Sequence, residues 1–312
     1  MGDAASAVAE KPESTAVATQ ARVRRRVVVI GGGFAGINAA QELAKLPVDV
    51  TLVDRKNYHT FQPLLYQVAL AVLSPADIAQ PIRSILKTHP NIEVLMDEAL
   101  GFDLNARTIQ LKSGSVLEYD YMVLATGSTH SYFGQDGWSK LAPGLKTVED
   151  ATEIRRRVLL AFELAERHMM EHGTHPPLQF VIVGGGPTGV ELAGAISDIA
   201  RLYMRNNFRY IDTRKAKVTI LEGSPHILAM YPEDLQASAR KQLEKLGVEI
   251  RTSSVVTDIQ PGYVIVRGKD GAEQRMDAVV TLWAAGVQAS PLGKMIGVPT
   301  DKKGCVLVDE HL

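Results

Sequence analysis

The chain has 312 residues, enough for two domains with cores of their own, and its formal net charge of −1 gives no indication of a nucleic-acid partner. Its single cysteine, Cys305, excludes an intrachain disulfide framework and a redox pair of cysteines. No apolar run is long enough to span a bilayer, and residues 1–21 are rich in Ala, Ser and Thr without aromatics, which predicts a disordered tail. With no secretion signal recognisable, a cytoplasmic location is the default expectation.

The first predicted structural unit covers residues 27–54. An unbroken apolar run at 27–30 is typical of a strand that is buried on both faces. A helix is predicted over 37–46, and a second strand over 48–53 ends at Asp54. Between the first strand and the helix lie three glycines with G-x-G-x-x-G spacing: Gly31, Gly33 and Gly36.

This arrangement indicates a dinucleotide site. Gly31 permits a tight turn, Gly33 lets a pyrophosphate approach bare backbone, and Gly36 allows close packing of helix and strand. The amino end of the helix offers free N–H groups to the phosphates. Asp54 is placed to accept hydrogen bonds from a ribose, and the competing interpretations are a structural glycine turn and a solvated acid.

The same pattern occurs a second time. An apolar strand at 180–183 precedes a helix from about Thr188 and a strand at 217–221 that ends at Glu222, after an arginine-rich insertion at 201–216. The glycines are Gly184, Gly186 and Gly189. Two such units imply two bound dinucleotides, and two bound dinucleotides imply electron transfer between them.

Several elements are predicted between the two units. The stretch 58–69 has neither helical nor strand period and is expected to be an ordered loop. Alternating polarity over 99–121 predicts antiparallel hairpins. The remaining elements before the crossover at 128–146 are a short helix at 82–86, strands at 92–95 and 121–124, and the small-residue exit Ala125-Thr126-Gly127.

A helix capped by Asp150 and running to about Met170 is expected to open the second domain. After the second unit the sequence predicts a helix at 232–246 and hairpin strands at 248–251, 255–259 and 263–267, closed by a turn at Lys269-Asp270-Gly271. A buried strand is predicted at 278–283 and a last strand at 305–308. The buried strand ends at Ala284-Ala285-Gly286, which echoes the first exit. Each exit either brings backbone close to a cofactor or is a crossover turn to the other domain.

Five stretches resemble type II NADH:quinone oxidoreductases, the non-proton-pumping NADH dehydrogenases. They are Gly-Gly-Gly-Phe-Ala-Gly at 31–36, the segment 54–69, Val-Leu-Ala-Thr-Gly-Ser at 123–128, the segment 184–194 and Trp-Ala-Ala-Gly-Val at 283–287. The glycine motifs are common to two-dinucleotide flavoproteins, whereas the stretch 58–69 narrows the resemblance to this family.

The resemblance implies an α/β fold with two Rossmann-like dinucleotide-binding domains. FAD would occupy the first unit, NADH the second, and a quinone would accept the electrons at the cytoplasmic face of the inner membrane, to which the family attaches peripherally; a homodimer is also compatible. The FAD-binding domain would cover 22–145 and resume at 287–312, with the NADH-binding domain, 146–286, inserted. Because the sheet of the FAD-binding domain is expected to need more residues than 287–312 provide, we expect a fragment that holds FAD weakly.

The resemblance also selects candidate residues. Glu191, next to the second glycine motif, is the candidate catalytic residue, and a helix-start acid is the alternative. Glu222 predicts a preference for NADH over NADPH, because an acid repels a 2′-phosphate. The residues expected to contact the dinucleotides are Gly31, Gly33, Phe34, Ala35, Gly36, Asp54, Arg55, Lys56, Gln67, Ala125, Thr126, Gly127, Gly184, Gly186, Pro187, Thr188, Gly189, Glu222, Ala285 and Gly286.

Other functions and sites compete with this interpretation. A ferredoxin- or rubredoxin-type reductase would use the same two dinucleotide sites, and a non-catalytic NADH-binding protein would need only the second. His59 could donate a proton to a quinone, although a hydrogen-bonded loop histidine is favoured. His168 and His172 share a helix face, but no carboxylate completes a ligand set, so no metal is expected.

Overall fold

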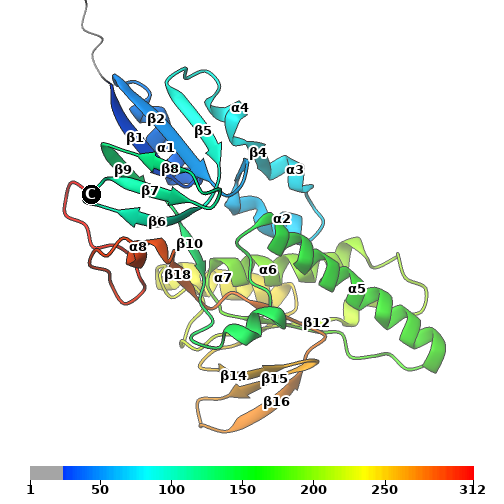
Figure 1. Ribbon diagram of the computed structural model, residues 1–312. Coiled ribbons are helices and arrows are strands. Elements are labelled where there is room, and N and C mark those ends of the chain that lie inside the picture. The colour runs from blue at the N-terminus through cyan, green and yellow to red at the C-terminus, as the bar shows by residue number, and fades with distance from the viewer. Residues whose placement is uncertain (1–23) are drawn as a thin grey trace, which may run out of the picture.

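The computed structural model describes residues 24–312 and consists of two lobes (Figure 1). The tail predicted for residues 1–21 lies outside the described residues. The first lobe is built on a fully parallel sheet of four strands. In spatial order they are β5 (Ile92–Met96), β2 (Val48–Asp54), β1 (Arg25–Ile30) and β9 (Tyr121–Leu124).

Both faces of this first sheet are covered, as the unbroken apolar run in β1 requires. Val29 packs on one side against α1 (Phe34–Leu43) and α4 (Ile82–Leu86). Val28 and Ile30 pack on the other side against an antiparallel meander. The meander contains β6 (Ala99–Asp103), β7 (Thr108–Leu111) and β8 (Val116–Glu118), which confirms the hairpins predicted over 99–121.

The second lobe repeats this plan. Its parallel sheet has the order β13 (Val248–Arg251), β12 (Lys217–Leu221), β11 (Gln179–Val183) and β17 (Val280–Trp283). One face is covered by α5 (Val148–His172), α6 (Pro187–Asp198) and α7 (Glu233–Lys245). The other face is covered by the meander β14 (Val255–Gln260), β15 (Tyr263–Arg267) and β16 (Glu273–Asp277). The duplicated pattern in the sequence is therefore a duplicated three-layer architecture, and the α/β class is confirmed.

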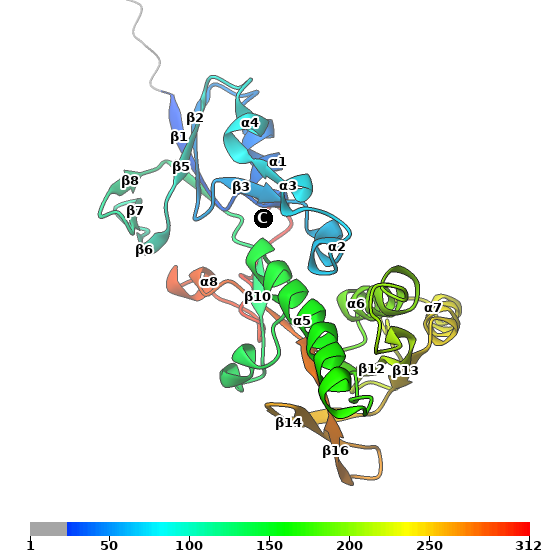
Figure 2. The same ribbon diagram turned by 90° about the vertical axis from the view of Figure 1, so that its right-hand side faces the viewer.

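Two connections join the lobes, as Figure 2 shows from the side. The first is a two-stranded antiparallel ribbon of β10 (Ser128–His130) and β18 (Val287–Ala289). The second is α2 (Leu65–Ala69), which belongs to the first half of the sequence but packs in the core beside α5 and α6. After β18 the chain forms α8 (Leu292–Met295), whose Leu292 packs beside the meander of the first lobe.

The structure corrects two predictions in the first half of the chain. The stretch 58–69 is not a loop: β3 (Tyr58–Thr60) pairs with β4 (Ala79–Pro81), and the helix α2 follows. A five-residue helix is too short to display a helical period. Helix α5 is capped by Thr147 and not by Asp150, because the Asp150 N–H donates to Thr147 Oγ1 while the Asp150 carboxylate accepts from the Thr147 N–H. The two residues form a capping box.

Three further corrections concern the second half. Strand β13 is a parallel edge strand of the main sheet, not a hairpin strand. The predicted turn at Lys269-Asp270-Gly271 leads into β16, whose mostly polar sequence gave no strand signal. The strand predicted at 305–308 is reduced to a single bridge between Thr300 and Val306.

None of the helices in residues 24–312 has the length and apolar character needed to cross a membrane.

Candidate dinucleotide sites

The first glycine loop is fixed by packing at two of its glycines. Gly31 has φ +107°, and its N–H donates to Val53 O at 2.8 Å. A Cβ added to Gly31 would overlap the carbonyl oxygen of Ala125, and one added to Gly36 would overlap the carbonyl oxygen of Gly31. The protein itself therefore requires glycine at positions 31 and 36.

The middle glycine of the loop is different. Gly33 is the N-cap of α1 in extended backbone, and a Cβ built there would meet no atom within 4 Å. Gly33, Phe34 and Ala35 are exposed at the amino end of α1, where the first-turn N–H groups point out of the helix. No contact within residues 24–312 explains the glycine at 33, whereas a pyrophosphate lying on the backbone would.

Asp54 has a structural role that sequence reasoning missed. Its Oδ2 accepts the Gly32 N–H at 2.5 Å, and its Oδ1 accepts the Lys56 N–H at 2.7 Å. The carboxylate thus holds the glycine loop against the end of β2. This arrangement fixes the position of an acid that is predicted to bind a ribose.

The second loop reproduces the first contact by contact. Gly184 has φ +109°, and a Cβ there would lie 2.6 Å from backbone atoms of Ala284. A Cβ on Gly189 would overlap Gly184 O, whereas one on Gly186, the N-cap of α6, would meet nothing within 4 Å. Glu222 takes the place of Asp54: its Oε2 accepts from Gly185 N at 2.6 Å and its Oε1 from Ser224 N at 2.7 Å. Pro187 and Thr188 form the first turn of α6 beside this loop.

The two small-residue exits lie against the two glycine loops. The Ala125 N–H donates to Ile30 O at 2.8 Å, and the Ala284 N–H donates to Val183 O at 2.7 Å. Thr126 and Gly127, like Ala285 and Gly286, continue directly into the ribbon of β10 and β18. Each exit therefore contacts a glycine loop and also begins a crossover, which confirms the crossover turn, while contact with a cofactor stays a prediction.

The two basic residues that follow Asp54, Arg55 and Lys56, each lie close to a carboxylate of the protein. Arg55, which is exposed, lies 3.6 Å from Glu98. Lys56 Nζ contacts both Glu149, in the first turn of α5, and the Tyr58 hydroxyl, which in turn donates to Glu149 Oε1 at 2.8 Å. Partial burial raises the pKa of Glu149, but the hydrogen bonds from Lys56 and Tyr58 outweigh it and lower that pKa to about 2. This cluster of Lys56, Tyr58 and Glu149 ties the segment after β2 to the start of α5.

Glu191 and Gln67 lie on neighbouring helices. Because α6 begins at Pro187, Glu191 stands in the second turn and not the first, so it does not complement the helix dipole as a first-turn acid would. The residue as a whole is exposed, but partial burial of its carboxyl raises the pKa of Glu191 above the ordinary value. Gln67 lies in α2 and donates to the Tyr66 hydroxyl at 3.1 Å.

An aromatic cluster beside the first loop was not predicted as a unit. The Phe34 ring meets the His59 ring edge to face at 4.8 Å and the Phe61 ring at 5.6 Å. His59 Nδ1 lies 3.1 Å from the carbonyl oxygen of Gly32, so the histidine is hydrogen-bonded as predicted, although it lies in the strand β3 and not in a loop. The aromatic residues at 58–61 were the only sign of this cluster in the sequence. Their contact with Phe34 depends on the fold and could not be predicted.

No group of three or more potential metal ligands is present within residues 24–312. The imidazoles of His168 and His172 meet edge to face with their centroids 4.5 Å apart near the end of α5.

Comparisons with known proteins agree with this duplicated architecture. The family described as pyridine nucleotide-disulphide oxidoreductase matches residues 25–312, so the chain belongs to that family. Membership implies FAD and NAD as cofactors, and the two glycine loops fit such groups because Gly33 and Gly186 leave bare backbone facing outward.

Within this class the chain is similar to type II NADH:quinone oxidoreductases. It is 42% identical over 297 residues to NdhA of Mycobacterium tuberculosis, covering 93% of this chain and 63% of the relative. It is 40% identical to Ndh of the same organism, covering 91% of this chain and 63% of the relative. The chain thus spans less than two thirds of the length of these curated relatives.

A solved structure of NDH2 from Plasmodium falciparum in complex with NADH has a similar fold. Its TM-score is 0.79 at 23% sequence identity, and the match covers 88% of this chain and 58% of that chain.

Proposed function

We propose that the chain binds FAD at the loop of residues 31–36 and NADH at the loop of residues 184–189, and that it forms the dinucleotide-binding part of a type II NADH:quinone oxidoreductase. The observation that carries this proposal is the pair Gly33 and Gly186. Both are glycines at helix amino ends whose missing side chain faces open space, so a ligand and not the protein accounts for them.

The bound cofactors would supply hydride and electron transfer, so no nucleophilic side chain is needed. The protein has to hold the two dinucleotides in fixed positions. Asp54 and Glu222 fix the two glycine loops, because each carboxylate accepts hydrogen bonds from two backbone N–H groups. We infer that either acid also accepts hydrogen bonds from a ribose, and at Glu222 the charge would disfavour a 2′-phosphate.

The ribbon of β10 and β18 supports an exchange between the two sites. Gly127 lies at one end of the ribbon and Gly286 at the other: Ser290 N donates to Gly127 O at 3.3 Å, and Ser131 N donates to Gly286 O at 3.1 Å. Three residue pairs of strand span roughly 10 Å. The small-residue exits beside the two proposed cofactor sites are thus close enough together for two extended dinucleotides to meet.

The names of the relatives support the choice of electron acceptor. The two mycobacterial relatives are named as quinone oxidoreductases, and a Solanum tuberosum protein named as an external alternative NAD(P)H-ubiquinone oxidoreductase is 30% identical over 304 residues. We therefore propose a quinone as acceptor. Peripheral attachment at the cytoplasmic face of the membrane is part of the proposal because the resemblance to type II NADH:quinone oxidoreductases implies it. A homodimer is compatible with this proposal.

The test is a comparison of electron acceptors. After the protein is loaded with FAD under anaerobic conditions, NADH should bleach the flavin, and a short-chain quinone should restore its colour faster than a ferredoxin does. Gly186→Ala is the matched control, since its fold should be intact and its flavin should stay oxidised when NADH is added. Faster reoxidation by ferredoxin would establish a ferredoxin-type reductase instead.

A further inference from the structure

The two glycine loops share a buried carbonyl group that the glycine spacing alone does not fix. It belongs to Gly32 in the first loop and to Gly185 in the second, the residues that precede Gly33 and Gly186. Both residues are buried, and buried carbonyl groups in native proteins are nearly always paired. The donor that pairs with each carbonyl is therefore part of the construction of its loop.

The two loops use different donors for this carbonyl. In the second loop the donor is the main chain, because the Leu228 N–H donates to Gly185 O at 2.8 Å. Leu228 has φ +53°, a left-handed conformation that a leucine rarely adopts, and in it the amide reaches the loop. In the first loop the donor is a side chain: His59 Nδ1 lies 3.1 Å from Gly32 O. Since a carbonyl can only accept, Nδ1 carries the proton.

The position of His59 is fixed from two directions. Its backbone lies in β3, where His59 pairs with Gln80 of β4. Its ring meets the ring of Phe34, the first residue of α1, edge to face at 4.8 Å. The donor at Nδ1 is thus held beside the glycine loop by strand pairing and by an aromatic contact.

A hydrogen bond to Gly32 O also determines the direction of the N–H group that follows it. The C=O and N–H groups of a trans peptide point in opposite directions, and residues 24–312 contain no cis peptide bond. Because His59 holds Gly32 O, the Gly33 N–H points away from His59, and Leu228 has the same effect on the Gly186 N–H. Neither of these two N–H groups donates to another atom within residues 24–312. Both are available to a phosphate oxygen at the start of a helix.

We propose that His59 is a positioning residue of the FAD site. Its Nδ1–H holds the peptide between Gly32 and Gly33 in the orientation in which the Gly33 N–H donates to the FAD pyrophosphate. This inference rests on the proposed function, which assigns FAD to the first loop. The second loop obtains the same orientation from the main chain of Leu228, so a change at His59 affects FAD and spares NADH.

Equilibrium titration of the full chain with FAD and with NADH tests the role of His59. His59→Phe keeps an aromatic ring beside Phe34 but removes the donor, so its affinity for FAD should fall about fivefold, the effect of one neutral hydrogen bond. His59→Asn restores a donor near the position of Nδ1 and should bind FAD nearly as tightly as the wild type. The affinity for NADH should be the same in all three proteins.

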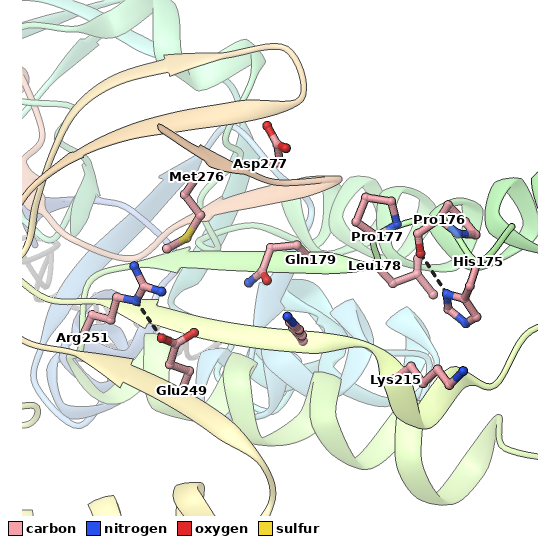
Figure 3. Close-up of a pocket in the computed structure, with 11 residues that line it drawn as sticks. His175, Pro176, Pro177, Leu178, Gln179, Lys215, Glu249, Arg251, Met276 and Asp277 are labelled. Atoms are coloured by element: carbon pink, nitrogen blue, oxygen red, sulfur yellow. Dashed lines mark hydrogen bonds and ion pairs between the residues drawn. The ribbon is translucent and has the colours of Figure 1, made fainter. Parts of the chain in front are cut away.

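His175 provides the matched control (Figure 3). Its Nδ1 also pairs with a carbonyl oxygen, that of Pro176 at 2.9 Å, but it lies before β11 and lines a pocket of about 440 Å³. The five residues of β11, a length of roughly 16 Å, separate this pocket from the second glycine loop. His175→Phe removes the same kind of donor as His59→Phe and should leave the affinities for FAD and NADH unchanged.

Three results would overturn the role of His59 alone. They are FAD binding by His59→Phe that is as tight as that of the wild type, FAD binding by His59→Asn that is as weak as that of His59→Phe, and a joint fall of the FAD and NADH affinities. A wild-type chain that binds NADH but not FAD would overturn the proposed function as well, so the two failures are distinguishable.

Discussion

At the residue scale, the carboxylate of Glu222 is fixed by two backbone N–H groups and carries the expected cofactor preference. We predict that kcat/KM is higher for NADH than for NADPH, because the negative charge repels a 2′-phosphate. Glu222→Gln removes that charge and leaves one carbonyl oxygen for two donors. The ratio of the two kcat/KM values should fall about tenfold, which corresponds to the loss of one charged hydrogen bond.

Glu244→Gln, an exposed change on α7 in the same lobe, is the control for this measurement. Equal kcat/KM values for the two cofactors in the unmodified protein would rule out the assignment of Glu222 to the ribose.

Glu191 is the residue for which a chemical role is predicted. Because partial burial raises its pKa, the neutral acid persists to a higher pH than at an ordinary glutamate, and the carboxylate forms as the pH rises through that raised value. We predict that Glu191→Gln keeps the affinity for FAD, slows flavin reduction by NADH or its reoxidation, and flattens the pH dependence of the affected rate.

Rapid-mixing absorbance of each half-reaction between about pH 5 and pH 8 measures this effect. If both rates and both pH profiles match those of the wild type, Glu191 is only a helix residue.

Glu149 gives a pH-dependent contribution to stability. Its pKa is lowered to about 2 from the ordinary 4.5, so the stabilisation from its contacts with Lys56 and Tyr58 is complete above about pH 5 and is lost as the pH falls toward 2. The side chain of Glu149 is 66% exposed, so water screens the pair and its contribution is at most about 1 kcal/mol.

The Tm of Glu149→Gln should therefore lie a few degrees below that of the wild type near neutral pH, and the gap should close in acid and in 1 M salt. Glu171→Gln, at the other end of α5, should show no such gap. A gap that persists in acid would mean that the ion pair is not its source.

At the scale of the element, the glycine loops contain two kinds of glycine. Gly36→Ala and Gly189→Ala place a Cβ on a backbone carbonyl of the same loop, which must push the helix away from the strand. We predict a loss of at least about 2 kcal/mol of stability, typical of overpacking. Gly33→Ala and Gly186→Ala meet open space and should cost less than about 1 kcal/mol, since only the helix cap changes.

Thermal unfolding of the four alanine variants tests this division. Equal losses of stability at all four positions would contradict the geometry described for the loops.

At the scale of the whole molecule, the parts of the fold that could be predicted are those with local signals. The strands at 27–30 and 180–183 are continuous apolar runs, and each is buried between a helical layer and a meander. The capping of α5 was misassigned because Thr147 and Asp150 both fit a helix start, and only the reciprocal hydrogen bonds identify the cap.

Other features depend on contacts between distant segments and leave no trace in the local sequence. Examples are the burial of Val68 of α2 in the core of the second lobe and the pairing of Lys56 with Glu149. The candidate site residues were predicted by motif and remain predictions, although the packing of the protein supplies a reason for four of the glycines: Gly31, Gly36, Gly184 and Gly189. The hydrogen bond from the Gly32 N–H to the Asp54 carboxylate could not be predicted. An acid that binds a ribose and an acid that fixes the glycine loop have the same sequence signature.

The central claim is that the two loops are separate sites, the first for FAD and the second for NADH. The most direct test is titration of Gly33→Ala and Gly186→Ala with FAD and with NADH, because neither alanine meets any protein atom within 4 Å. We predict that Gly33→Ala weakens FAD at least tenfold and spares NADH, while Gly186→Ala does the reverse. Unchanged binding of both cofactors in both variants, or a loss of FAD in Gly186→Ala alone, would contradict the account.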